Sequence, residues 1–165
     1  MLTKTTAGQH TAMFKRNLLR LNIAIFFLFI GHPSAWAQSI TPVQELGFGT
    51  FALKNNSSRY LLRVSRLGVV TSDSQFVILS PPTPAEYSLS GFTPSTLLVV
   101  TIPDSTITVG GDSFDLESFT PTPGLTTDSS GNAVLRFGAS LYSSGLGANY
   151  TNGSFSGTIN ITVNY

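Results

Sequence analysis

Hydrophobic and polar residues alternate along much of the chain after residue 37, and the clearest run covers residues 153–165. Every second position there is apolar or glycine, and the positions between are serine, threonine or asparagine. This period of two predicts a long, half-buried β-strand with a fixed register. Asn152 and Gly153 form a tight-turn pair at its start. The shared apolar face consists of Phe155, Gly157, Ile159, Ile161, Val163 and Tyr165.

Shorter runs with the same period occupy residues 59–66, 85–90 and 132–142. Residues 97–100 are apolar on both faces, which predicts a strand in the centre of a sheet. Clusters of glycine, proline, asparagine and serine separate the runs, and no helical period follows residue 37. Short strands at this spacing predict an all-β fold, an antiparallel sandwich or barrel.

The N-terminal part has a different pattern, which is typical of a secretory signal peptide. The apolar run at 21–30 is about half as long as the roughly 20 residues that a transmembrane anchor, the alternative, requires. Helix breakers and the small-residue pattern Ala35-Trp36-Ala37 come after this run. A basic patch precedes it, formed by Lys15, Arg16 and Arg20. We expect cleavage between Ala37 and Gln38.

This division predicts a signal peptide at residues 1–37 and a single β-sandwich domain at residues 38–165. Residues 1–14 make the leader unusually long, so translation starting at Met13 is an alternative. The protein would meet the membrane only during export. We expect it to be secreted, into the periplasm or to the cell surface.

Removal of the leader changes the charge and the chemistry of the chain. Four of the nine basic residues lie in residues 1–37, whereas all eight acidic residues follow them, which leaves a net charge of −3. A weakly acidic domain has no general attraction for nucleic acid or anionic lipid. The leader also holds every histidine, methionine and tryptophan, and the chain has no cysteine.

The exported domain therefore lacks the side chains of the common catalytic and metal sites. A serine nucleophile usually needs an imidazole base, and zinc, copper and haem usually need histidine or cysteine. We predict no enzyme, no cofactor and no metal. Two alternatives use carboxylates: a calcium site without the EF-hand spacing, and a glycosidase-like acid pair. Solvated strand edges are the favoured explanation for these acidic residues, which are Asp104, Asp112, Asp115, Glu117 and Asp128.

Three further features of the sequence are compatible with ligand binding but also have a simpler structural or chance explanation. Arg59, Arg63 and Arg66 could bind an acidic glycan, although charged residues also protect sheet edges from pairing. The aromatic residues Tyr142, Tyr150 and Phe155 could form a sugar platform, with core packing favoured at least for Phe155. Five glycosylation sequons are attributed to chance, at Asn55, Asn56, Asn149, Asn152 and Asn160.

Several segments resemble a bacterial family of small exported domains known as domain of unknown function 4402. They are residues 45–50 (ELGFGT), residues 85–91 leading to Ile102-Pro103, residues 153–157, and residues 161–165 (ITVNY). Members of this family are similar in layout to fimbrillins and surface proteins. The resemblance implies an immunoglobulin-like β-sandwich with fimbrial or surface associations, and it supplies no catalytic residues.

We therefore expect a structural surface subunit, fimbrial or surface-layer, that assembles with itself or with other surface subunits by strand addition. The terminal strand has the alternation that this mode needs. The start of the exported domain is short for a donor arm, and Pro42 interrupts it. The alternative is a monomeric adhesin-like or glycan-binding module, whose binding loops would be residues 80–84 and 120–131.

Overall fold

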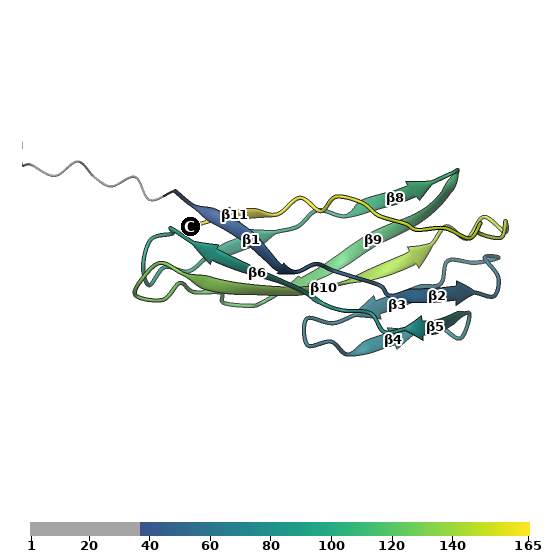
Figure 1. The fold of residues 1–165 in the computed structure, drawn as a ribbon, viewed down its shortest axis with the longest axis horizontal. Helices are drawn as coiled ribbons and strands as arrows, with labels where there is room; N and C mark the ends of the chain where they lie inside the picture. Colours follow the sequence, from purple (N-terminus) through teal and green to yellow (C-terminus); the bar gives the residue numbers. More distant parts are fainter. Residues whose placement is uncertain (1–36) are drawn as a thin grey trace, which may run out of the picture. The chain divides into compact units, whose positions relative to one another are not determined.

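The computed structural model describes residues 37–165, so the predicted signal peptide lies outside the described residues except for Ala37. Within the described part the regular structure is all β (Figure 1). No helix in residues 37–165 is long and apolar enough to cross a membrane. The strands are β1 Ser39–Gln44, β2 Thr50–Leu53, β3 Leu61–Val64, β4 Val70–Ser72, β5 Phe76–Ser80, β6 Ala85–Ser90, β7 Val99–Thr101, β8 Ser105–Val109, β9 Asp112–Pro121, β10 Ala133–Ser143 and β11 Thr162–Asn164.

The strands form one large sheet and two small ones, and every pairing is antiparallel. The seven-stranded sheet has the order β1-β6-β10-β3-β4, with β9 paired to β10 and β8 paired to β9. β7 pairs with β11, and β2 pairs with β5. The predicted all-β antiparallel fold is confirmed.

The core lies on one face of the seven-stranded sheet, in two clusters. The first cluster gathers buried residues of β6 and β10, such as Leu89 and Phe137, and includes Val163 of β11. The second gathers buried residues of β3, β9 and β10, and β2 and β5 cover it with residues such as Phe51 and Phe76. Each fully buried Leu or Phe contributes about 1.5–3 kcal/mol, and the chain has no disulfide to add to this.

The predicted strands at 85–90 and 132–142 are confirmed, with the expected residues facing the core. The run at 59–66 contains β3, in which Leu62 and Val64 are buried and Arg63 is exposed. β10 is the central strand, because it pairs with β6, β3 and β9.

The prediction of a central strand at residues 97–100 is wrong. Leu97 and Val99 are 58% and 57% exposed, whereas Leu98 is buried. The reason is that β7 belongs to a two-stranded sheet and packs on the core with only one of its faces. The continuous apolar run indicated a strand buried on both faces, whereas β7 is covered on one face only.

The β1–β2 and β5–β6 segments form a ribbon that crosses from the large sheet to a small one. At the crossing Gly47 and Thr83 exchange two backbone hydrogen bonds of 3.0 and 2.7 Å. A Cβ on Gly47 would lie 2.9 Å from the Thr83 hydroxyl, and Gly49 has a φ of +68°. Leu46 and Phe48, which alternate with these glycines, pack against the core. The LGFG motif therefore combines inward apolar anchors with glycines that permit close backbone approach.

Candidate functional site

The predicted assembly strand, residues 153–165 (the terminal segment), is extended, but only Thr162–Asn164 pairs as a strand, with β7. The prediction of a strand along its whole length is therefore wrong. The alternation is nevertheless present, because Phe155, Ile159, Ile161 and Val163 are half-buried and the residues between them are exposed. In Figure 1 the segment is the yellow trace that passes β8 and ends in β11.

The apolar face of the terminal segment is used inside the domain. The Phe155 ring meets the Phe114 ring edge to face at 5.0 Å, and Tyr150 stacks on Phe114 at 4.3 Å. Gly157 lets the segment approach β8, because a Cβ there would lie 3.0 Å from Ile107 Cγ1. The apolar face of the predicted assembly strand is thus seated on the domain's own core.

Tyr165, the last predicted member of this face, lies elsewhere. It is 62% exposed, and its ring contacts Phe92 edge to face at 6.0 Å. Its hydroxyl accepts a hydrogen bond of 2.6 Å from Gln38 Nε2. The residue after the predicted cleavage point therefore lies beside the last residue of the chain, while cleavage itself stays a prediction.

The main chain of the terminal segment before β11 is unpaired in the part of the chain that the structure describes. Within residues 37–165 no backbone hydrogen bond joins residues 153–161 to another segment. A backbone N–H or C=O group without a partner keeps its capacity to form a hydrogen bond. A stretch with anchored side chains and unpaired backbone has the chemistry of an exposed sheet edge, which can accept an added strand.

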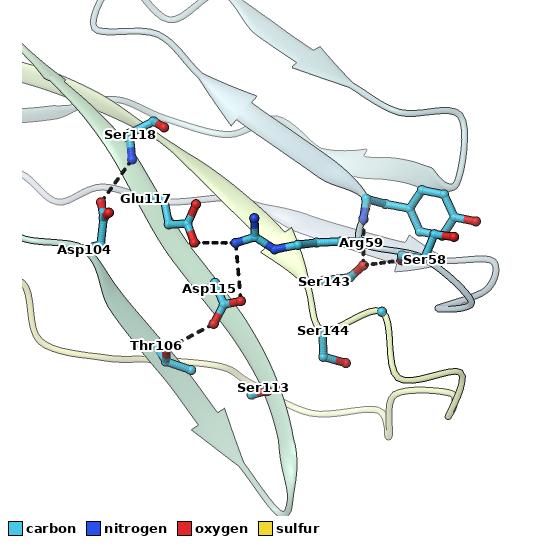
Figure 2. Close-up of polar contacts among 12 residues, drawn as sticks. Ser58, Arg59, Asp104, Thr106, Ser113, Asp115, Glu117, Ser118, Ser143 and Ser144 are labelled. Atoms are coloured by element: carbon cyan, nitrogen blue, oxygen red, sulfur yellow. Dashed lines mark hydrogen bonds and ion pairs between the residues drawn. The ribbon is translucent and has the colours of Figure 1, made fainter.

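One arginine of the predicted basic stripe, Arg59, meets two members of the acidic cluster, Asp115 and Glu117, as Figure 2 shows. The Arg59 guanidinium contacts both Glu117 and Asp115 and lies 4.0 Å from the centre of the Tyr142 ring. The hydrogen bond to Glu117 is the main cause that raises the pKa of Arg59. Asp115 also accepts a hydrogen bond of 3.1 Å from the Thr106 hydroxyl.

The predicted stripe is therefore divided. Arg59 is occupied by two carboxylates and an aromatic ring, whereas Arg63 and Arg66 form no ion pair within the described residues. The possible aromatic platform is divided as well, because Tyr142 lies under Arg59 while Tyr150 and Phe155 pack around Phe114. The structure brings neither set together as one binding surface.

The remaining carboxylates hold turns and bulges together. Asp104 accepts the backbone N–H of Ser118 at 3.1 Å (Figure 2). Asp112 accepts the Thr151 hydroxyl and N–H at 2.6 and 2.8 Å, and these bonds lower its pKa. Asp128 accepts the N–H groups of Asn132 and Ser130, which lower its pKa as well.

These arrangements bear on the calcium and glycosidase alternatives. Among residues 37–165 no three acidic, histidine or cysteine side chains come together in a group that could hold a metal ion. Asp115 and Glu117 share one guanidinium, so as a pair they are engaged by the protein itself. The geometry favours the structural explanation of the acidic residues.

The two loops proposed for binding also have internal roles. Residues 80–84 form the ribbon crossing, where Pro82 is buried and Thr83 bridges to Gly47. In residues 120–131, Leu125 and Thr127 are buried, and the Thr127 hydroxyl donates to the Thr93 carbonyl at 2.7 Å.

Sequence reasoning missed two features of this region. One is the contact of Arg59 with Glu117 and Tyr142. The three residues lie in separate strands or loops, so no local sequence pattern indicates that they meet. The other is the exposure of β1 at every residue. Its short length and its proline were visible in the sequence and are consistent with a peripheral strand.

The family of this chain follows from comparison with family models. A model described as "Domain of unknown function (DUF4402)" matches residues 39–165, from the start of β1 to the last residue. Searches of curated proteins and of solved structures found no significant match. The match covers all eleven strands of the described part, so the chain belongs to the DUF4402 family.

Proposed function

We propose that this protein is a non-catalytic, exported structural subunit of a fimbrial or surface-layer assembly, and that its subunits join by strand addition. The observation that carries the proposal is the unpaired main chain of residues 153–161. Core contacts on one face hold this stretch extended, so its backbone is already in the conformation that a new strand would pair with. Because the acceptor is pre-organised, pairing would cost little ordering entropy.

The small β7–β11 sheet supports the same proposal. A two-stranded sheet is marginal by itself, and three or more strands are usually needed for independent stability. β11 has three residues, and residues 153–161 of the terminal segment, which precede it, are extended without a ladder. An added strand would extend this sheet along residues 153–161 and would pair backbone groups that have no backbone partner within residues 37–165.

The competing proposal is a monomeric surface module that binds glycans. It rests on Arg63 and Arg66, whose charges have no ion-pair partner within residues 37–165. Guanidinium groups bind carboxylate and sulfate groups of acidic sugars. This function requires no self-association, so measuring the assembly state separates the two proposals.

The test uses the chain from Gln38 onward, since Ala37–Tyr165 forms a compact unit with its ladders and core contacts internal. Sizing chromatography and unheated gels should show oligomers or filaments. A sharp monomer at every concentration, with binding to acidic glycans that Arg63→Ala weakens, would support the competing module.

Proline substitutions locate the edge that accepts the added strand. Neighbouring residues of an extended segment direct their N–H groups to opposite edges, so Thr158→Pro and Ile159→Pro each remove a donor from a different edge. Each is compared with alanine at the same position, which keeps the N–H. One proline variant should lose assembly while its alanine control assembles. Assembly by both folded proline variants, verified by circular dichroism, would overturn the proposed acceptor.

A further inference from the structure

β1 is held on the domain almost entirely by its backbone ladder. All six of its residues are exposed, with Ile40 37% and Val43 65% exposed. It pairs with β6 from Ser39↔Ser90 to Gln44↔Glu86, and the register shifts between Pro42 and Gln44. A typical hydrogen bond contributes only about 0.5–1.5 kcal/mol net, and β1 buries little apolar surface in addition. Local opening of β1 therefore costs little free energy.

Opening of β1 would leave its partner strand in place. β6 is paired to β10 through Ala133↔Leu89 to Phe137↔Ala85. Leu89 and Ala85 have no exposed surface, so the core holds β6 independently of β1. The result of opening is an ordered, unpaired β6 edge, which is a template for an extended segment.

The point about which β1 can move is Glu45, the exposed residue between β1 and the anchored LGFG motif. Beyond it Gly47 is held by two backbone hydrogen bonds to Thr83, and Leu46 and Phe48 pack against the core. β2 is also anchored, because the Phe51 ring contacts the rings of Phe76 and Phe114 at 5.1 and 5.6 Å. β1 can therefore move while β2 keeps its place.

We propose that β1 is an exchangeable strand, and that β1 of one copy pairs with β6 of a second copy. A second copy supplies the same strand with the same register, so the ladder lost in one molecule is regained in the other. β1 has no charged residue that would repel another copy. This inference goes beyond the proposed function, because it uses the N-terminal strand and not the terminal segment.

The test is a disulfide between copies. Thr41 and Ser88 are register partners, so cysteines there would have the Cα separation of a ladder pair, which suits a disulfide. The chain has no cysteine of its own, so Thr41→Cys and Ser88→Cys each introduce a single thiol. Copies of residues 38–165 with tags of different size, one carrying each substitution, are mixed and oxidised, and the mixed disulfide is measured on non-reducing gels.

The matched control mixes Ser88→Cys with Thr71→Cys, since Thr71 lies on β4, which pairs with β3. Exchange predicts several-fold more mixed disulfide with Thr41→Cys than with the control. Equal yields from the two mixtures would overturn the proposal. The mixing should also proceed when Thr158→Pro or Ile159→Pro has abolished assembly at the terminal segment, so the failure of one proposal is distinguishable from the failure of the other.

Disulfides within one copy provide a second test. It compares two double variants that have Ser88→Cys in common. In the Thr158→Pro or Ile159→Pro background that has lost assembly at the terminal segment, the double variant Thr41→Cys/Ser88→Cys, oxidised while dilute, ties β1 to its own β6 and should stop co-purification of untagged with tagged copies. The variant Ser88→Cys/Val134→Cys ties β6 to β10 at another register pair and should leave co-purification unchanged. Equal co-purification with both double variants would contradict exchange of β1.

Discussion

At the scale of single residues, Asn56 shows how one polar side chain organises a loop. It is only 3% exposed, and its Nδ2 donates to Ser144 Oγ at 2.8 Å and to the Ala148 carbonyl at 3.2 Å. Its Oδ1 accepts the N–H of Gly145 at 2.9 Å. Although Asn56 begins a glycosylation sequon, its amide faces the protein interior. Asn56 therefore links the loop after β2 to the loop after β10 through side-chain hydrogen bonds.

Replacing Asn56 by alanine should destabilise the domain, because the buried side chain loses three hydrogen bonds and the half-buried Ser144 and Gly145 lose their partner. We expect a loss of about 1–3 kcal/mol in the free energy of unfolding, measured by urea titration. Asn55→Ala is the control, since Asn55 is exposed and its hydrogen bonds, to Gln75 and Ser57, are exposed as well, so a change within about 0.5 kcal/mol is expected. Equal losses in the two variants would contradict this role of Asn56.

At the scale of strands, the β9–β10 pair contains a bulge that depends on close backbone contact. Its register shifts between Gly138 and Ser140. Opposite the shift, Ser118 has a φ of +53°, and Asp104 holds its N–H. A Cβ on Gly138 would meet the backbone of Val64 and Ser65 at under 3.0 Å. Glycine at 138 therefore allows β3 to lie against β10.

The substitution Gly138→Ala should force β3 away from β10. Its clash is with backbone atoms, which cannot rotate aside, so we expect a loss of about 1–3 kcal/mol or more in unfolding free energy. Gly153→Ala is the matched control, because no atom lies within 4 Å of its added Cβ. That variant should be unchanged, or more stable by up to about 1 kcal/mol, as the unfolded chain loses freedom. Thermal unfolding measures both variants.

At the scale of the whole molecule, the fold ties together segments that are distant in sequence and relies on carboxylates to do so. Asp112 joins the start of β9 to Thr151, and Asp128 organises the turn before β10. Both have a pKa below the ordinary value of 3.8, because hydrogen bonds favour the charged form. Their contribution to stability is therefore complete above the unfolded value and is lost as pH falls through the lower, folded values.

The domain should accordingly lose stability in acid, beginning as the pH falls below about 4. Urea unfolding at pH 7 and at pH 3 measures this loss. Asp112→Asn and Asp128→Asn should each make the difference between the two pH values smaller, whereas Glu45→Gln, at an exposed position, is the control. The same acid loss in all three variants and in the parent chain would contradict the assignment to Asp112 and Asp128.

The alternation of apolar and polar residues predicted much of the fold, because in a strand it determines which side chains are buried. Leu62, Leu89, Phe137 and Leu141 all face the core as the period of two indicates. The continuous apolar run at residues 97–100 led to the wrong prediction of a central strand, since it could not show that β7 belongs to a two-stranded sheet with one face on the core. Contacts such as Arg59 with Glu117, which are 58 residues apart, leave no local trace in the sequence.

Alternation along the terminal segment was enough to identify which side chains face the core, because side-chain direction in extended chain is a local property. Hydrogen-bond pairing is not local, since it depends on which other segment comes alongside. Only the three-dimensional arrangement showed that residues 153–161 lack a ladder, that β1 lies exposed on β6, and that the acidic residues are bound by Arg59 and by backbone donors. The unpaired strand edges on which both proposals depend are determined by the tertiary structure. The apolar faces that hold those strands in place are determined by the sequence itself.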